Sequence, residues 1–244
     1  MKRLVHILFT RIYLLFKQRK FKKRLSYVFI NNHAEKLLVV FSAFTPKPTY
    51  NYMRTLSRVN SYDKLFILDD FGYRGSYYWF ESGTDLPLKL TKELLENIIG
   101  ARKYSSVSTM GTSKGGTCAI FFGLEFNVDH IYSGACQYYV GNYLNTEEHE
   151  PILRGMLGDN YTNDDVEKLN RMLPSQLSSH KGSKTLIHLL YSENEHTYPE
   201  HIVHLISDLC TNSIQHTKRI EKFEDHNDVG KFFQRYIISE LQIS

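Results

Sequence analysis

The chain alternates between short apolar runs and longer amphipathic segments. Continuous apolar runs at residues 36–43, 64–70, 129–135 and 184–191 are typical of strands that are covered on both faces of a sheet. Segments with helical spacing lie between them, and the clearest covers residues 86–101. Strands that alternate with helices predict an α/β protein with a mostly parallel, doubly wound sheet, in which ligands bind beyond the carboxyl ends of the strands.

The remaining segments complete this pattern. Residues 27–30 and 218–223 are further strand candidates, and a last helix is expected over residues 229–241. Residues 136–183 are polar and helix-rich, which predicts a small helical insertion over the carboxyl edge of the sheet. Residues 25–244 are therefore predicted to form a single domain with this insertion.

The N-terminal segment 1–24 differs from the rest, because it holds nine Lys or Arg residues and no Asp or Glu. It is predicted to form a basic amphipathic arm, whose apolar run is too short, and too interrupted by Arg11, to span a bilayer. One possibility is a helix that docks on the domain or on a partner subunit. The other is an in-plane membrane anchor, in which each basic residue gains roughly 1 kcal/mol of binding free energy from anionic lipid. We expect a cytoplasmic protein, peripheral at the inner face of the membrane in the second case.

Composition narrows the function classes. Hydrophobic residues make up 42% of the chain and its three cysteines are scattered, which favours an ordinary folded protein in a reducing compartment. Outside the arm, 30 − 9 = 21 basic residues face 26 acidic ones, so no nucleic-acid-binding surface is expected. His196, His201 and His204 match no zinc-motif spacing, so neither a metal nor another cofactor is predicted.

The motif Gly111-Thr112-Ser113-Lys114-Gly115-Gly116 is the main chemical signal in the chain. A β-prone run precedes it and a small-residue, helix-like run follows it, which is the form of a nucleophile elbow. The sharp turn would press the residues two before and two after the serine against neighbouring backbone, and both are glycines. The alternative is a glycine-rich turn that binds phosphate at a helix N-terminus, with no acid and histidine downstream.

An elbow serine requires an acid and then a histidine later in the chain. Glu195 follows the strand 184–191 by four residues, and Glu193 is the second choice for the acid. His226 lies between the last strand and the last helix, where the base is expected. Ser113, His226 and Glu195 are therefore predicted as nucleophile, base and orienting acid, although loop carboxylates and a surface histidine would give the same pattern.

The transition state would need two oxyanion donors. We expect them to be the backbone N–H of Lys114 and that of Ala43 or Phe44. The Lys114 side chain is expected to be solvated, with attraction of an anionic substrate group as the alternative. Three aromatic residues of the loop after residue 70 are predicted as a substrate wall, with ordinary packing as the alternative: Tyr73, Tyr77 and Trp79.

These residues together resemble the α/β-hydrolase superfamily over roughly residues 26–244. The elbow motif, the loop 70–76 and the positions of Glu195 and His226 carry the resemblance. The Ser-Lys-Gly-Gly form, the polar insertion and the basic arm are also similar to bacterial capsule and surface-glycan biosynthesis proteins, including the XcbB/CpsF type and accessory-secretion glycan acetyltransferases. The sequence departs from the α/β-hydrolase pattern in two places. The loop 42–44 lacks the His-Gly dipeptide of many esterases, and the acid is Glu195 where Asp is commoner.

The expected function is a cofactor-independent, serine-dependent acyl-ester hydrolase that acts on an acylated glycan or a small ester. One alternative is an O-acyltransferase of a bacterial surface polysaccharide, which differs from a hydrolase in how well the site excludes water. The other is a non-catalytic module of a membrane-associated glycan-assembly system. The sequence predicts no oligomeric state.

Overall fold

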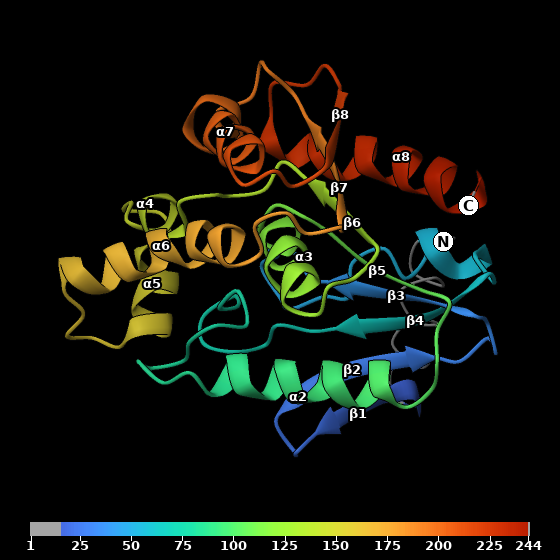
Figure 1. Ribbon diagram of the computed structural model, residues 1–244. Coiled ribbons are helices and arrows are strands. Elements are labelled where there is room, and N and C mark those ends of the chain that lie inside the picture. The colour runs from blue at the N-terminus through green and yellow to red at the C-terminus, as the bar shows by residue number, and fades with distance from the viewer. Residues whose placement is uncertain (1–15, 244) are drawn as a thin grey trace, which may run out of the picture.

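The structure is a computed structural model that describes residues 16–243. Its strands form one sheet in the order β1-β2-β4-β3-β5-β6-β7-β8 (Figure 1). β1 and β2 pair antiparallel, as do β2 and β4, and all other neighbours are parallel. The strands are β1 Gln18–Phe21, β2 Leu25–Ile30, β3 Lys36–Phe41, β4 Tyr62–Ile67, β5 Ser106–Thr112, β6 His130–Gly134, β7 Leu186–Tyr191 and β8 His216–Ile220.

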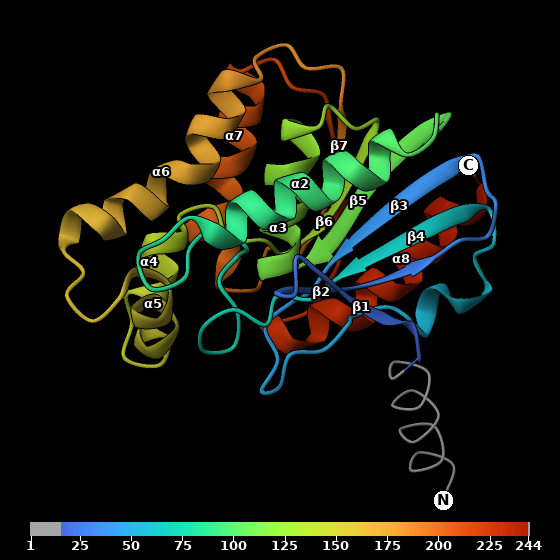
Figure 2. The same cartoon turned by 90° about the horizontal axis from the view of Figure 1, so that it is seen from below.

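Helices cover both faces of this sheet. They are η1 Thr55–Arg58, α2 Leu86–Gly100, α3 Lys114–Glu125, α4 Val140–Leu144, α5 Glu150–Leu157, α6 Asn163–Ser179, η2 Tyr198–Ile202, α7 Val203–Thr211, η3 His226–Asp228 and α8 Val229–Ile243. The helices α2, α3, α6 and α7 share one apolar core, whereas α8 packs on the opposite face with η1 (Figure 2). The predicted doubly wound, mostly parallel α/β sheet is confirmed.

Strand β3 shows why the sequences of the central strands are continuously apolar. Leu37, Val39 and Phe41 point into the core under α3, while Leu38 and Val40 point into the core under α8. All five side chains are buried. Alternation between two cores requires an apolar residue at every position, which is the pattern that the sequence shows.

The segment predicted as an insertion forms α4, α5 and α6. These helices lie together beyond the carboxyl ends of the parallel strands, at the left of Figure 1. A capping box on Thr162 and Asp165 begins α6, the longest of them. The insertion therefore borders the edge of the sheet at which ligands bind in parallel α/β folds.

Part of the segment predicted as a basic arm lies in the sheet. Gln18–Phe21 pairs with residues 25–28 as an antiparallel hairpin at the edge of the sheet, with residues 22–24 as its turn. The exposed basic side chains there suit an edge strand, because charge discourages pairing with another chain. The rest of the predicted arm, residues 1–15, lies outside the described residues. No helix within residues 16–243 has the length and apolar character needed to cross a membrane.

Candidate active site

Ser113 occupies the turn between β5 and α3 in a strained backbone conformation, with φ 52° and ψ −127°. A Cβ on Gly111 would lie 2.3 Å from the carbonyl carbon of Gly115, and a Cβ on Gly115 would lie 2.7 Å from the Phe41 carbonyl oxygen. The prediction that only glycine fits at these two positions is confirmed. The Ser113 amide donates to the Gly134 carbonyl at 2.8 Å, which ties the turn to the neighbouring strand β6.

Ser113, His226 and Glu195 form one line of hydrogen bonds. The Ser113 Oγ lies 2.9 Å from His226 Nε2, and His226 Nδ1 lies 2.8 Å from Glu195 Oε1. Three loops at the carboxyl ends of β5, β7 and β8 carry these residues, which are 113 and 31 positions apart along the chain. The second choice for the acid, Glu193, is exposed on the same loop as Glu195.

Glu195 is fully buried, and its carboxylate is nevertheless favoured. Burial alone would raise the pKa of Glu195, but hydrogen bonds from His226 and Thr197 outweigh it and hold that pKa below its ordinary value. The Thr197 hydroxyl donates to Oε2, the oxygen that His226 does not contact. Glu195 is thus an ionised acceptor that fixes the orientation of the His226 ring.

Gln137 is the site residue that the sequence did not predict. It follows β6, is fully buried, and donates from Nε2 to the Ser113 Oγ at 3.0 Å. The Tyr77 hydroxyl donates to its Oε1 at 3.3 Å, so both ends of the amide are hydrogen-bonded. The Ser113 hydroxyl therefore accepts from Gln137 and donates to His226, so its proton points toward the imidazole.

Both predictions for the Lys114 side chain, solvation and attraction of an anionic substrate group, are wrong. Its ammonium is neither solvated nor open to a substrate, because it is fully buried in an ion pair with Asp69 at 2.6 Å. It lies 5.3 Å from the ring centre of Phe44 and 5.0 Å from that of Tyr78. Asp69 also accepts from the Ser76 amide at 2.7 Å. The pair fastens the elbow helix to the loop after β4.

The predicted oxyanion loop follows β3 and is held by the same network. The Ser42 amide donates to the Tyr78 hydroxyl at 3.0 Å, and the Ser42 Oγ accepts from the Asp69 amide at 3.1 Å. The Ala43 amide donates to Asn51 Oδ1 at 2.8 Å, so it is engaged and not free for an oxyanion. The Phe44 amide has no acceptor within the described part of the chain. Phe44 is therefore the better candidate of the two.

The predicted aromatic wall is wrong for two of its three residues. Tyr77 and Trp79 are fully buried and stack on each other with ring centres 5.3 Å apart. Positive φ angles of 56° and 57° at Tyr77 and Tyr78 turn this loop inward. Tyr73 alone is exposed, and it lines a pocket of about 470 Å³ beside α5 whose lining includes none of Ser113, His226 and Glu195.

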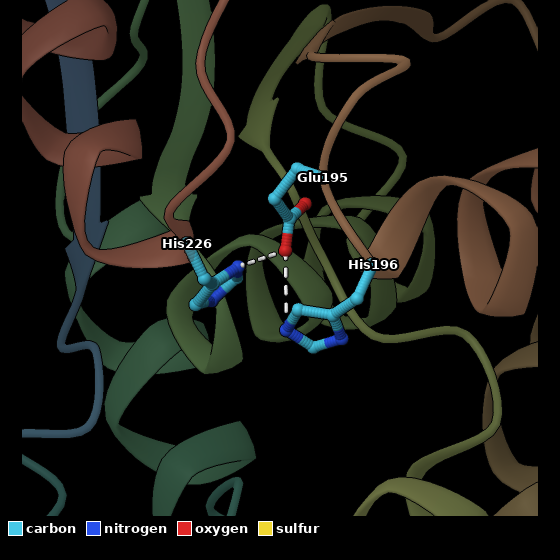
Figure 3. A group of neighbouring side chains, drawn as sticks. All are labelled: Glu195, His196 and His226. Carbon is cyan, nitrogen blue, oxygen red and sulfur yellow. Dashed lines mark hydrogen bonds and ion pairs between the residues drawn. The ribbon is translucent and has the colours of Figure 1, made fainter.

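A second histidine meets the same carboxylate. His196 Nε2 lies 3.2 Å from Glu195 Oε1, the oxygen that His226 also contacts, as Figure 3 shows. The three side chains bring two imidazole nitrogens and one carboxylate oxygen within 4.8 Å of one another. His226 and His196 come from different loops, so the ligand spacing along the sequence gave no sign of this group.

Solved structures with a similar backbone identify the fold. The capsule O-acetyltransferase of Neisseria meningitidis serogroup A superposes with a TM-score of 0.75 at 21% identity, over 89% of this chain and 91% of that one. The chain has the α/β-hydrolase fold. A fluorophosphonate-binding serine hydrolase of Staphylococcus aureus shares this α/β-hydrolase fold with a TM-score of 0.63 at 13% identity, over 89% and 91% of the two chains.

Two further matches belong to glycan systems. A histidine-to-alanine mutant of the same meningococcal protein, in complex with CoA, matches with a TM-score of 0.74 at 19% identity, over 89% of this chain and 91% of that one. The Glycosylation Associate Protein (Gap123) complex of Streptococcus agalactiae matches with a TM-score of 0.72 at 17% identity, over 92% of this chain but 46% of that one. No protein-family model and no curated protein matches the sequence.

Proposed function

We propose that this α/β-hydrolase-fold protein is a serine O-acyltransferase that moves a short acyl group, such as acetyl, onto a hydroxyl of a bacterial surface polysaccharide. The observation that carries the proposal is the hydrogen-bonded line from Ser113 through His226 to Glu195 at the elbow. The likeness to a capsule O-acetyltransferase favours transfer over the hydrolysis that the sequence first indicated. The mutant of that protein in complex with CoA suggests a CoA thioester as the acyl donor.

In the first half-reaction the Ser113 Oγ attacks the carbonyl carbon of the thioester while His226 Nε2 accepts the hydroxyl proton. Glu195 stabilises the imidazolium that forms, because its carboxylate accepts from Nδ1. The tetrahedral intermediate collapses with cleavage of the carbon–sulfur bond, and His226 returns the proton to the leaving thiolate. The products are free thiol and an acyl ester on Ser113.

In the second half-reaction a sugar hydroxyl attacks that ester. His226 Nε2 takes the hydroxyl proton and then gives it to the Ser113 oxygen as the ester bond breaks. The acyl group leaves on the glycan and the free serine is restored. Water would follow the same path, so hydrolysis and transfer differ only in the acceptor that reaches the acyl-enzyme.

The negative charge on the carbonyl oxygen would be met by backbone amides. The Lys114 N–H stands at the N-terminus of α3, where the helix dipole favours an anion. The Phe44 N–H is the second donor in this proposal, since Ala43 is engaged with Asn51. The buried Lys114–Asp69 pair would hold these two amides at a fixed separation, because the Lys114 side chain packs against the Phe44 ring.

Gln137 would favour a glycan acceptor over water. Its amide is 3.0 Å from the Ser113 Oγ, where an ordered water could otherwise bond the serine. An amide that fills this position removes one site for a hydrolytic water without blocking a hydroxyl that arrives from solvent. This role concerns the balance between transfer and hydrolysis and not the presence of the acyl-enzyme.

A fluorophosphonate probe tests the nucleophile first. The wild-type chain should label on serine, and Ser113→Ala should abolish labelling. Ser108→Ala is a matched control, because Ser108 is a buried serine of β5, the strand before the elbow, and its hydroxyl has no hydrogen-bond partner within residues 16–243. Equal labelling of wild type and Ser113→Ala, or no labelling of the wild type, contradicts the enzyme and favours the non-catalytic module.

An acyl-CoA assay then separates transfer from hydrolysis. Release of free CoA thiol is followed with and without a polysaccharide bearing free hydroxyls, and the acyl content of the polysaccharide is measured at the end. Transfer predicts faster thiol release with the acceptor and acyl groups on the glycan. Thiol release at one rate in both conditions, with free acid as the product, identifies a hydrolase instead.

A further inference from the structure

The group of Glu195, His196 and His226 has the composition of a zinc ligand set. Two imidazoles and one carboxylate, with a fourth position left for water, are typical ligands of Zn²⁺ in open protein sites. Glu195 Oε1 lies 2.8 Å from His226 Nδ1 and 3.2 Å from His196 Nε2, so one ion between the three needs only small side-chain movements (Figure 3).

Each imidazole also has an oxygen atom near its other nitrogen. His226 Nε2 lies 2.9 Å from the Ser113 Oγ, and His196 Nδ1 lies 3.6 Å from Glu200 Oε2. Metal-bound imidazoles usually donate their second N–H to an oxygen acceptor, which fixes the ring tautomer. The carboxylate is anchored as well, because Thr197 donates to the Glu195 oxygen that faces away from both histidines.

Solvent reaches this group from the His196 side. The His196 side chain is 49% exposed, His226 is 18% exposed and Glu195 is fully buried. An ion can therefore arrive through His196 and remain partly hydrated on that side. The buried carboxylate supplies the negative charge at the inner end of the group.

We infer that Zn²⁺ binds between Glu195, His196 and His226 and switches the enzyme off. The ion would take the lone pair of His226 Nδ1, so the ring proton would move to Nε2. A protonated Nε2 donates to the Ser113 Oγ and can no longer accept the serine proton. His196 would bind the ion through Nε2, with its Nδ1 turned toward Glu200 Oε2, 3.6 Å away.

The ion is an inhibitor in this proposal and not a resident cofactor. Binding itself is independent of the chemistry of the site, whereas inhibition rests on the proposed function. Two readouts therefore keep the claims separate: zinc binding to the full chain, and fluorophosphonate labelling of Ser113.

Binding is measured by titrating Zn²⁺ into the metal-free full chain against a chromogenic chelator. We expect one ion per wild-type chain and a Kd weakened about tenfold or more in His196→Gln, which loses one ligand. Glu200→Gln should weaken binding by less. His204→Gln is the matched control, because His204 is an exposed histidine on the neighbouring helix that packs on Tyr139, and it should bind as the wild type does. Mg²⁺ should not compete, since it prefers oxygen ligands.

Labelling is measured with and without Zn²⁺, and each protein is compared with its own rate in EDTA. Zinc should slow labelling of the wild type and of His204→Gln, and His196→Gln should need about tenfold more zinc for the same effect. Unchanged zinc affinity in His196→Gln, with its circular dichroism spectrum intact, overturns the site. Binding without slower labelling overturns the inhibition. A wild type that never labels refutes the proposed function, while the chelator titration still decides whether the ion binds.

Discussion

Two buried carboxylates stand on either side of the elbow, and they have different partners. Asp69 pairs with Lys114, the residue after the serine, and both side chains are fully buried. Glu195 pairs with His226, and only the carboxylate is fully buried while the imidazole is 18% exposed. The first pair is closed on all sides by Ser42, Ser76 and aromatic rings, whereas the second leads from the interior to solvent through a histidine.

This difference in burial indicates a structural role for the first pair and a chemical role for the second. The Asp69–Lys114 pair is fully buried and accepts a hydrogen bond from the Ser76 amide, so it is suited to holding loops in place. The Glu195–His226 pair ends in an imidazole nitrogen 2.9 Å from the Ser113 Oγ, which suits proton transfer to and from Ser113. Breaking each pair separately should therefore give different results in activity and in stability.

The largest effect is expected from Glu195→Gln. The amide can present a donor to Nδ1 and so favours the wrong ring tautomer, as happens when the acid of a serine triad is replaced by its amide. We expect the rate of acyl transfer to fall about 10⁴-fold. The free energy of unfolding should change far less than the activity. Steady-state kinetics and urea unfolding of the same preparation measure both quantities.

Glu193→Gln is the matched control for this change. Glu193 lies two residues away on the same loop and is exposed, so its loss should leave the rate within about twofold. Comparable losses in the two variants would mean that the loop, and not the Glu195 carboxylate, supports activity.

Lys114→Met should act mainly on stability. It leaves Asp69 buried without its counter-charge, and removal of one partner of a buried ion pair costs about 3–5 kcal/mol. The double variant Asp69→Asn, Lys114→Met should recover part of the loss, because no buried charge is then unpaired. Urea unfolding of the four proteins gives the coupling free energy. Strict additivity of the two single changes would show that the pair does not stabilise the fold as a unit.

The sequence was informative wherever a local signal sufficed. The strand, the glycine spacing and the helix around Ser113 are contiguous, so the elbow and its steric requirement were predictable and the structure confirms them. The chain order of acid and base follows from the parallel sheet, which led to Glu195 and His226. The structure brings both to Ser113, and their catalytic role stays a prediction.

What the sequence did not reveal depends on contacts between distant loops. Asp69 and Lys114 are 45 residues apart, and nothing near Lys114 indicates that its side chain turns inward. The positive φ of Tyr77 and Tyr78 buries an aromatic loop that looked like a surface wall, because side-chain type alone does not report such a backbone turn. Gln137 had one usable sign, since a polar residue three positions after the end of a buried strand lies near the carboxyl edge of the sheet.

A pair of histidines, His188 and His130, differs from both ion pairs, because only His188 is buried and its side-chain hydrogen-bond partners are His130 and Thr217. His188 Nε2 lies 3.2 Å from His130 Nδ1, and its Nδ1 lies 3.0 Å from the Thr217 hydroxyl. Burial, and then the neighbouring His130, lowers the pKa of His188 to about 4. The unfolded chain therefore binds more protons than the folded one between about pH 4 and pH 6.5, so stability rises with pH across this window.

Acidification from pH 6.5 to pH 4 should accordingly lower the free energy of unfolding, and protonation of His188 accounts for on the order of 2–3 kcal/mol of this loss. The measurement is urea unfolding of wild type and His188→Phe at pH 7 and at pH 4.5. The wild type should lose more stability than the variant on acidification, since the variant has no proton to bind there. Equal losses in both proteins would show that His188 is not held neutral by its surroundings.

The smallest effect is expected from Gln137, the neutral partner of Ser113. Gln137→Ala removes the amide that donates to the serine and leaves room for a water in its place, so one hydrogen bond of roughly 1 kcal/mol is lost. We expect acyl transfer to slow by about tenfold or less, while hydrolysis of the acyl-enzyme rises because water can bond the serine in place of the amide. The ratio of free acid to acylated glycan measures this change independently of the overall rate. A lower rate with an unchanged ratio would mean that Gln137 orients the Ser113 hydroxyl and has no part in the choice of acceptor.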